Sequence, residues 1–468
     1  MSAIPPAPVC KVSRIYFNYY LADVKLLGIR PECGVNVMPE DLSRYPTLPY
    51  NAVAYAMDAT RGKQLKLHAE FSGPPNSALL VRTADPVKQH GGSLRDYLEA
   101  AGIVIAEEDK SMPQARLLGD VAPTSVTFDA DGNSFVFVEG TPANPKDRDY
   151  GVVELTIDNA DIWRRGICAS WQLWQWQYSA DNGASWHSAG GLLENGISIH
   201  RIFTTKSVPT WPWTSYDEEV KNIDGEYLVS HPPLVGALEW ACRWANGETT
   251  EHGIASLITA GINDSGRFRY TSMQNYTSPF SNHFDCGRFV DRLNGRFGRG
   301  PNANCVDCTY MVISLANALG CQLQPGRISN PDGLCFELNP LTLIGDDEVA
   351  RDSLNDLLSP RFKFHQVVLR PVAAPDGDRY SVFDACLKFD VAIFLKYAYE
   401  KTTSEPKTTK LPPILQHGHP VDIPLGKSVF TFGYLAVLVK RFDQPSQTDL
   451  DVDHSDDLTY AIGSLKFY

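Results

Sequence analysis

The hydrophobic pattern changes its period near residue 212, and this change constrains the fold of the 468-residue chain more than any other feature. Between residues 61 and 210 apolar and polar side chains alternate, as at Leu65, Leu67, Ala69 and Phe71. A period of two is typical of strands with one buried face. Beyond residue 213, segments with helical spacing come first and alternating segments follow, which is typical of an α+β domain. We therefore predict a β-rich N-terminal part followed by an α+β part.

Prolines and glycines divide the chain further. Residues 1–60 are Pro-rich and are predicted to be irregular. Residues 61–145 are predicted to form an antiparallel β-sandwich module and residues 146–212 a second β-rich module. Residues 213–400 are predicted to form the α+β domain, and residues 401–468 a C-terminal strand segment with an acidic tail.

An aromatic row lies in the second β module, where Trp174, Trp176 and Tyr178 alternate with Gln. Such a row is typical of one packed face of a sheet, and a platform on which sugars stack is the alternative. The packed face is the favoured interpretation. The β modules are predicted to have a supporting or targeting role, and a protein or glycan partner for them is left open.

Charge and hydropathy exclude several classes of partner. The chain has 55 acidic and 42 basic residues, a net charge of −13, so a nucleic-acid partner is not expected. No segment approaches the roughly 18 apolar residues that a membrane span needs, and residues 1–8 do not resemble a secretory signal. A cytoplasmic protein with reduced thiols is the default expectation, and export that needs no signal is left open.

A cysteine is predicted to begin the third helix of the α+β part. Asn304 precedes it, Gly320 follows its apolar run, and four residues recur on one predicted buried stripe: Cys308, Val312, Leu315 and Leu319. Cys305 is then the first helical residue, where free N–H groups and the helix dipole stabilise a thiolate. Cys305 is therefore a candidate nucleophile, and Asp307 is a candidate for stabilising the helix start.

A histidine and an aspartate follow on two predicted strands. Residues 361–369 alternate in polarity and carry His365, and residues 380–387 form a second strand that carries Asp384. Directly opposed residues of paired strands lie about 5 Å apart at Cβ, so a carboxylate there reaches an imidazole N–H. We therefore expect Asp384 to orient His365.

The register follows from the connecting loop. If His365 lies opposite Asp384, then Leu369 lies opposite Tyr380. The loop that remains is the stretch 371–378, which is rich in Pro, Asp and Gly as turns require. The predicted pairing therefore comes from the position of the loop alone.

The order Cys305, His365, Asp384 supplies a nucleophile, a base and an orienting carboxylate. It resembles the transglutaminase-like superfamily of papain-related cysteine enzymes, whose bacterial members often carry Gly-x-Cys-x-Asp-(aromatic)-Ala at the nucleophile helix. Here Asn-x-Asn-Cys305-Val-Asp307-Cys308-Thr keeps the Cys-x-Asp core, and Val-Phe-Asp384-Ala matches the family's strand that ends in an aspartate. Upstream, residues 245–258, Tyr270 and residues 289–293 resemble the lead-in helices, so the resemblance covers residues 235–395.

The motif departs from the family pattern at several positions. Ala303 replaces the usual glycine, Cys308 replaces an aromatic residue, and Gln366 follows the histidine in place of a small residue. Val306 stands where protein-crosslinking members have Trp. These departures weigh against crosslinking more than against thiol chemistry. The resemblance therefore implies a hydrolytic enzyme that acts on protein or peptide amides: a cysteine peptidase, an amidase or a deamidase.

In the predicted mechanism the Cys305 thiolate attacks an amide carbonyl, and an acyl-enzyme forms. The backbone N–H of Cys305 is a candidate oxyanion donor, and Gln274 is a candidate side-chain donor. No metal or organic cofactor is required.

Several alternatives stay open. Cys305-x-x-Cys308 has the spacing of a redox dithiol or of half a zinc site, but the sequence offers neither a βαβ setting nor a second cysteine pair. A protein-crosslinking transglutaminase is a second candidate function. A non-catalytic β-sandwich binding or structural protein with an inactive thiol domain is a third.

Overall fold

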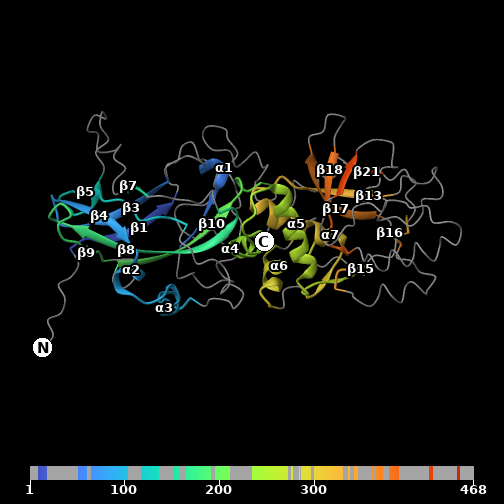
Figure 1. Ribbon diagram of the computed structural model, residues 1–468, viewed down its shortest axis with the longest axis horizontal. Helices are drawn as coiled ribbons and strands as arrows, with labels where there is room; N and C mark the ends of the chain where they lie inside the picture. The colour runs from blue at the N-terminus through green and yellow to red at the C-terminus, as the bar shows by residue number, and fades with distance from the viewer. Residues whose placement is uncertain are drawn as a thin grey trace. The chain divides into compact units, whose positions relative to one another are not determined.

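The computed structural model divides the chain into two compact units, Met1–Val208 and Pro209–Tyr468, close to the predicted boundary at residue 212. Each unit is described by itself (Figure 1). The structure describes residues 9–17, 51–60, 65–103, 117–135, 152–157, 165–190, 196–210, 234–271, 276–277, 284, 286–296, 300–329, 336–337, 342–345, 361–362, 364–372, 379–388, 421–424 and 451–453.

The first unit contains two β-sheets that enclose one core. One sheet has the order β1-β3-β7, and the other has the order β2-β10-β8-β4-β5-β6 with β9 paired to β8. Apolar side chains from both sheets meet in a single cluster. The strands are β1 (Lys11–Phe17), β2 (Asn51–Ala56), β3 (Lys66–Ser72), β4 (Ala78–Ala84), β5 (Thr124–Phe128), β6 (Ser134–Phe135), β7 (Val152–Thr156), β8 (Cys168–Ser179), β9 (His187–Ser188) and β10 (Ile197–Thr205).

The aromatic row on β8 lies in this core. Trp174 and Trp176 are fully buried, and Tyr178 is buried beside them. On the opposite face of the same strand, Leu173 packs in a second cluster with Leu98 of α3. The row is therefore the packed face of a sheet. The helices of this unit are short: α1 (Met57–Thr60), α2 (Pro86–His90) and α3 (Leu94–Ala100).

The structure differs from the two predicted β modules. Strand β4 from residues 61–145 pairs with β8 from residues 146–212, and β3 pairs with β7 across the same boundary. The two predicted modules therefore share both sheets instead of following one another. The period of two identifies a strand but carries no information on its partner.

Residues 1–60 also differ from the prediction, because they contribute β1 and β2. Strand β2 runs parallel to β10, and β1 pairs with β3. The predicted irregular segment therefore supplies a strand to each sheet.

The second unit places one helix at the centre of its core. Helix α7 (Cys305–Ala318) is buried at all fourteen positions, whereas the pattern predicted one buried stripe. It contacts the other helices and two strands of the main sheet. The other helices are α4 (Val235–Trp244), α5 (Glu251–Asp264) and α6 (Cys286–Leu293).

The main sheet of the second unit is antiparallel and has the order β20-β18-β17-β13-β21. Its two edge strands come from residues 401–468, for which a C-terminal strand segment was predicted, whereas a further predicted strand at 428–440 lies outside the described residues. The strands are β13 (Gln324–Ser329), β17 (Phe364–Val372), β18 (Arg379–Phe383), β20 (Val421–Pro424) and β21 (Asp451–Asp453).

Three short strand pairs complete the second unit as described. One of them, the parallel pair of β11 and β12, leads directly into α7. These strands are β11 (Arg269–Tyr270), β12 (Asn302–Ala303), β14 (Phe336–Glu337), β15 (Thr342–Leu343), β16 (Arg361–Phe362) and β19 (Leu387–Lys388).

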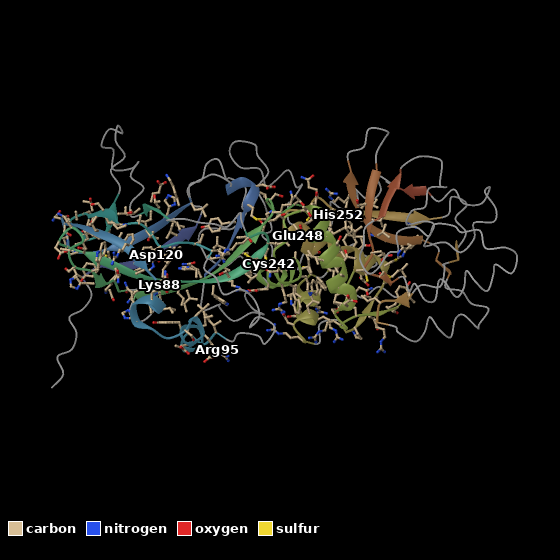
Figure 2. All side chains as sticks on the ribbon, in the orientation of Figure 1. Lys88, Arg95, Asp120, Cys242, Glu248 and His252 are labelled. Carbon is tan, nitrogen blue, oxygen red and sulfur yellow. The ribbon has the colours of Figure 1, made fainter. Side chains whose placement is uncertain are left out.

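The start of α5 holds this helix against the sheet. The Glu248 carboxylate accepts hydrogen bonds from the backbone N–H groups of Thr249 and Thr250, both at 2.8 Å. One turn later lies His252, labelled with Glu248 in Figure 2. Its ring packs against that of Phe383 in β18 in a T-shaped arrangement, with 5.9 Å between ring centroids. The helix therefore fixes the end of β18, from which the site described below begins.

Across the described ranges, no helix combines the length and the hydropathy needed to cross a lipid bilayer.

Candidate active site

Cys305 is the first residue of α7, as predicted from the sequence. The helix begins with a reciprocal capping box, in which Asn304 Oδ1 accepts from Asp307 N at 3.0 Å and Asp307 Oδ2 accepts from Asn304 N at 3.1 Å. Only 6% of Cys305 is exposed. The thiol is therefore held at a well-formed helix N-terminus, where the dipole favours negative charge.

Asp307 anchors a neighbouring segment to this helix start. Besides its bond to Asn304, the carboxylate accepts from Tyr276 N at 3.1 Å and from Thr277 N at 2.8 Å. The residue has no exposed surface. Three backbone N–H groups thus donate to its two oxygens. Asp307 therefore has a structural role, because it ties the start of α7 to the neighbouring segment.

Gln274, the predicted side-chain donor, lies outside the described residues.

His365 lies in β17 and is fully buried. Its Nε2 donates to Asp384 Oδ2 at 2.8 Å, and Cys305 is one of the groups close enough to raise the pKa of His365. The structure thus joins His365 and Asp384 by a hydrogen bond and places Cys305 near the imidazole.

The charge of Asp384 determines the protonation of His365. Burial lowers the pKa of His365, but the charge and hydrogen bond of Asp384, together with the nearby Cys305, outweigh it and raise this pKa to about 10. The imidazole is therefore protonated at neutral pH, and an imidazolium lies beside the thiol.

Asp384 is held by the turn that follows β18. Its second oxygen, Oδ1, accepts from Cys386 N at 2.8 Å and from Leu387 N at 3.2 Å. The side chain of Asn263 in α5 donates to Ala385 O at 2.8 Å and so fixes the same turn. The hydrogen bonds within the turn and the contact with α5 therefore hold the carboxylate in position to accept from the imidazole.

The observed register of β17 and β18 differs from the predicted one by two residues. Leu369 pairs with Val382, not with Tyr380. His365 and Asp384 are therefore diagonal neighbours rather than directly opposed, and a diagonal pair on one face remains within reach of long side chains. The strand β17 continues to Val372, because Pro371 and Val372 extend the ladder into the stretch that was predicted to be loop.

Three residues near this site were not singled out as site residues in the sequence. Cys308 and Cys386 are both buried, and each affects the pKa of the other. Burial and the neighbouring acidic groups, foremost Cys386 and Cys305, raise the pKa of the Tyr270 hydroxyl, so this half-buried phenol stays protonated. The position of Cys386, two residues after the candidate Asp384, was the sequence signal that could have identified it.

Within the part of the chain that the structure describes, no group of three or more His, Cys, Asp or Glu side chains is arranged to hold a metal ion.

Comparisons with known proteins add one distant likeness. No protein family matches the sequence, and no curated protein matches it. Among solved structures, the crystal structure of red sea bream transglutaminase matches at 11% identity and a TM-score of 0.30, over 74% of this chain. The match spans about half of that enzyme, 51% of its chain. The likeness is distant, and the case for the site rests on its own geometry.

Proposed function

We propose that the protein is a thiol-dependent enzyme that acts on amide bonds, with Cys305 as nucleophile, His365 as acid and base, and Asp384 as the orienting carboxylate. One observation carries the proposal: the buried imidazole of His365 is hydrogen-bonded to the carboxylate of Asp384, with 2.8 Å between Nε2 and Oδ2, and Cys305 is close enough to affect the charge of that imidazole. Such a chain of nucleophile, base and orienting acid is the arrangement that activates a weak nucleophile.

The first half-reaction begins with a proton transfer. His365 takes the proton of the Cys305 thiol, and the carboxylate of Asp384 stabilises the imidazolium that forms. The thiolate attacks the amide carbonyl, and the backbone N–H of Cys305, which has no partner inside its helix, supports the oxyanion. The imidazolium then gives its proton to the leaving amine, and the acyl-enzyme remains.

The second half-reaction depends on the acceptor. Water yields a hydrolase (a peptidase, amidase or deamidase), and an amine yields a transferase. The neutral imidazole left after amine departure removes a proton from either acceptor. We propose hydrolysis, because Val306 stands where crosslinking transglutaminases have Trp, and transfer to an amine is the outcome that the assay distinguishes from it.

The first test compares the cysteines of the folded protein. Iodoacetamide at neutral pH, followed by peptide mapping, is expected to modify Cys305 before the other seven described cysteines, all of which are buried. Cys242 in α4 is the matched control, because it is fully buried and has no place in the proposed site. Equal modification of Cys305 and Cys242 would contradict an activated thiol.

The second test supplies substrates. Peptides, glutamine-containing peptides and free amides are offered with and without a primary amine, and release of amine or ammonia is compared with amine incorporation. Cys305→Ser is expected to abolish turnover, whereas Cys242→Ser is expected to retain it. Release without incorporation supports a hydrolase, incorporation supports a transferase, and turnover by Cys305→Ser would refute the proposed nucleophile.

A further inference from the structure

One residue, Ile344, joins the strand that leads to the proposed nucleophile to the turn that holds Asp384. Its backbone C=O accepts from Tyr270 N at 2.9 Å, and its backbone N–H donates to Cys386 O at 2.9 Å. Ile344 is buried, so neither backbone group can turn to water if its bond is broken. Two parts of the site that are distant in the chain are thus connected through a single peptide segment.

On the nucleophile side, the connection runs through the parallel pair of β11 and β12. Tyr270 lies in β11 directly opposite Ala303 in β12. The next N–H group of the chain, that of Thr271, points to the other side and donates to Ala303 O at 2.9 Å. Ala303 directly precedes the capping residue of α7 and lies two residues before Cys305. The position of the helix start is therefore tied to Ile344.

On the carboxylate side, the connection reaches both donors that hold Asp384. Asp384 Oδ1 accepts from Cys386 N at 2.8 Å and from Leu387 N at 3.2 Å. The carbonyl of Cys386 is held by Ile344 N, and Leu387 pairs with the residue before Ile344, in the ladder of β15 and β19. Residues 342–345, which we call the bridging segment, thus fix both residues whose N–H groups orient the carboxylate.

The bridging segment fits against β11 because residue 345 is a glycine. Gly345 has φ +75°, in the left-handed region that residues with a Cβ rarely adopt. An added Cβ would clash with the carbonyl oxygen of Phe268 and would lie 2.7 Å from Cα of Arg269. Both are main-chain atoms just before Tyr270, so no side-chain rotation relieves the contact. A side chain at position 345 would therefore push the bridging segment away from β11.

We propose that the bridging segment sets the position of Asp384 relative to Cys305, with Ile344 and Gly345 as positioning residues of the proposed site. The kinetic part of this proposal rests on the proposed function, whereas the geometry of Asp384 can be tested without a substrate. Asn263 of α5 also holds the turn, through Ala385 O at 2.8 Å. Loosening the bridging segment is therefore expected to displace the carboxylate without releasing it.

The first test compares two glycine variants of the full-length protein. Gly345→Ala introduces the clash, and Gly247→Ala is the matched control, because Gly247 has φ +80° and an added Cβ there meets nothing within 4 Å. Both glycines are exposed, and both variants carry the cost of a Cβ at positive φ. Gly345→Ala is expected to lower kcat roughly 10²-fold at unchanged KM, the usual effect of a displacement of about 1 Å. Equal kcat values in the two folded variants would overturn the proposal.

The second test needs no substrate, because the imidazole of His365 reports where Asp384 lies. Burial lowers the pKa of His365, and Asp384, whose Oδ2 is 2.8 Å from Nε2, is the foremost group that raises it to about 10. In Gly345→Ala the NMR titration midpoint of His365 is expected to fall by roughly 1 pH unit or more, and in Gly247→Ala it is expected to stay. A general loss of stability moves the denaturation midpoint without moving this titration. An unchanged His365 titration in folded Gly345→Ala would refute the positioning role.

Amide hydrogen exchange of the wild type replaces these tests if Gly345→Ala does not fold. The N–H groups of Tyr270, Ile344 and Cys386 are expected to be protected and to open together as denaturant is added, as one cooperative unit does. An Ile344 N–H that exchanges as in an unfolded peptide, while the Cys386 N–H stays protected, would contradict the connection.

The two proposals fail in different ways. If the wild type turns over no amide, the proposed function is wrong, and the His365 titration still decides on the bridging segment. If the wild type turns over amides and Gly345→Ala does so as well as Gly247→Ala, the bridging segment alone is wrong.

Discussion

Replacing Asp384 by Asn tests the centre of the proposed site with a nearly isosteric change. In the protein, Asp384 Oδ2 accepts from His365 Nε2, and Oδ1 accepts from the N–H groups of Cys386 and Leu387. An amide has one acceptor oxygen, so the side chain of the Asp384→Asn variant satisfies either the imidazole or the turn. Either the His365 N–H or the two backbone N–H groups then face the amide NH₂ group and have no acceptor. An unsatisfied buried donor costs about 1–3 kcal/mol of folding free energy.

The charge has a larger effect on the imidazole. The pKa of His365 is raised to about 10 although burial by itself lowers it, and Asp384 is the foremost cause of the increase. Without the carboxylate we expect this pKa to fall toward its ordinary value of about 6.5, a change of roughly 3.5 pH units, or about 5 kcal/mol. At neutral pH the imidazole of His365 is then mostly neutral. We expect turnover to fall by roughly 10²- to 10⁴-fold, the usual contribution of a positioned acid–base group.

The assay is a pH titration of the labelled imidazoles by NMR, with the signal of His365 assigned from His365→Ala. In the wild type this signal is expected to stay that of an imidazolium from pH 6 to 9, and in Asp384→Asn it is expected to titrate near or below neutrality. Asp291→Asn is the control, because it removes a carboxylate that pairs with Arg296 at 3.0 Å elsewhere in the same unit. An unchanged His365 titration in Asp384→Asn would refute the electrostatic reasoning.

Three further predictions concern stability, and urea denaturation measures each of them. The pKa of His365 is higher in the folded state than in the unfolded state. The stability that the protonated His365 contributes is therefore complete below about pH 6.5 and is lost as the pH rises to about 10. If the stabilities of the wild type and of His365→Ala depend on pH in the same way, this prediction is wrong. Asp307→Ala leaves three backbone donors without their acceptor and is expected to cost about 3 kcal/mol or more, whereas Asp291→Ala is expected to cost about 0.5 kcal/mol or less. Gly326→Ala places a Cβ 2.3 Å from Leu369 Cδ1 and is expected to cost about 1–3 kcal/mol, so an unchanged denaturation midpoint would show that the core yields there.

The sequence predicts local structure around the site better than it predicts strand pairing. The apolar stripe from Cys308 to Leu319 and the glycine that follows it are sufficient to place Cys305 at the start of α7. The register of His365 against Asp384 was predicted two residues away from the observed pairing. A slip by one residue would expose the apolar face and is excluded by the pattern, but a slip by two preserves every side chain's face. Hydrophobic alternation therefore brings the two residues to one face without fixing which residues are opposed.

Contacts between distant segments were beyond the sequence pattern. Helix α7 was predicted to bury one stripe, and it buries all sides because strands and helices far away in the chain surround it. The influence of Cys386 on Cys308 has the same origin, since it joins a helix to a turn that the sequence pattern does not relate. The shared sheets of the first unit likewise depend on which strand meets β8, a choice that alternation alone does not make.

The complete burial of α7 has a consequence for synthesis of the protein. Residues 305–318 leave the ribosome before the segments that bury every side of this helix in the folded protein. The strand β17, which packs against the helix, is encoded about fifty codons later. At about 5–20 residues per second, several seconds separate the two segments. During that interval the nascent chain presents an apolar segment that a holding chaperone recognises. We therefore expect ribosome-bound chains that stop before residue 364 to be protease-sensitive around Cys305, and chains that extend past β18 to gain protection there.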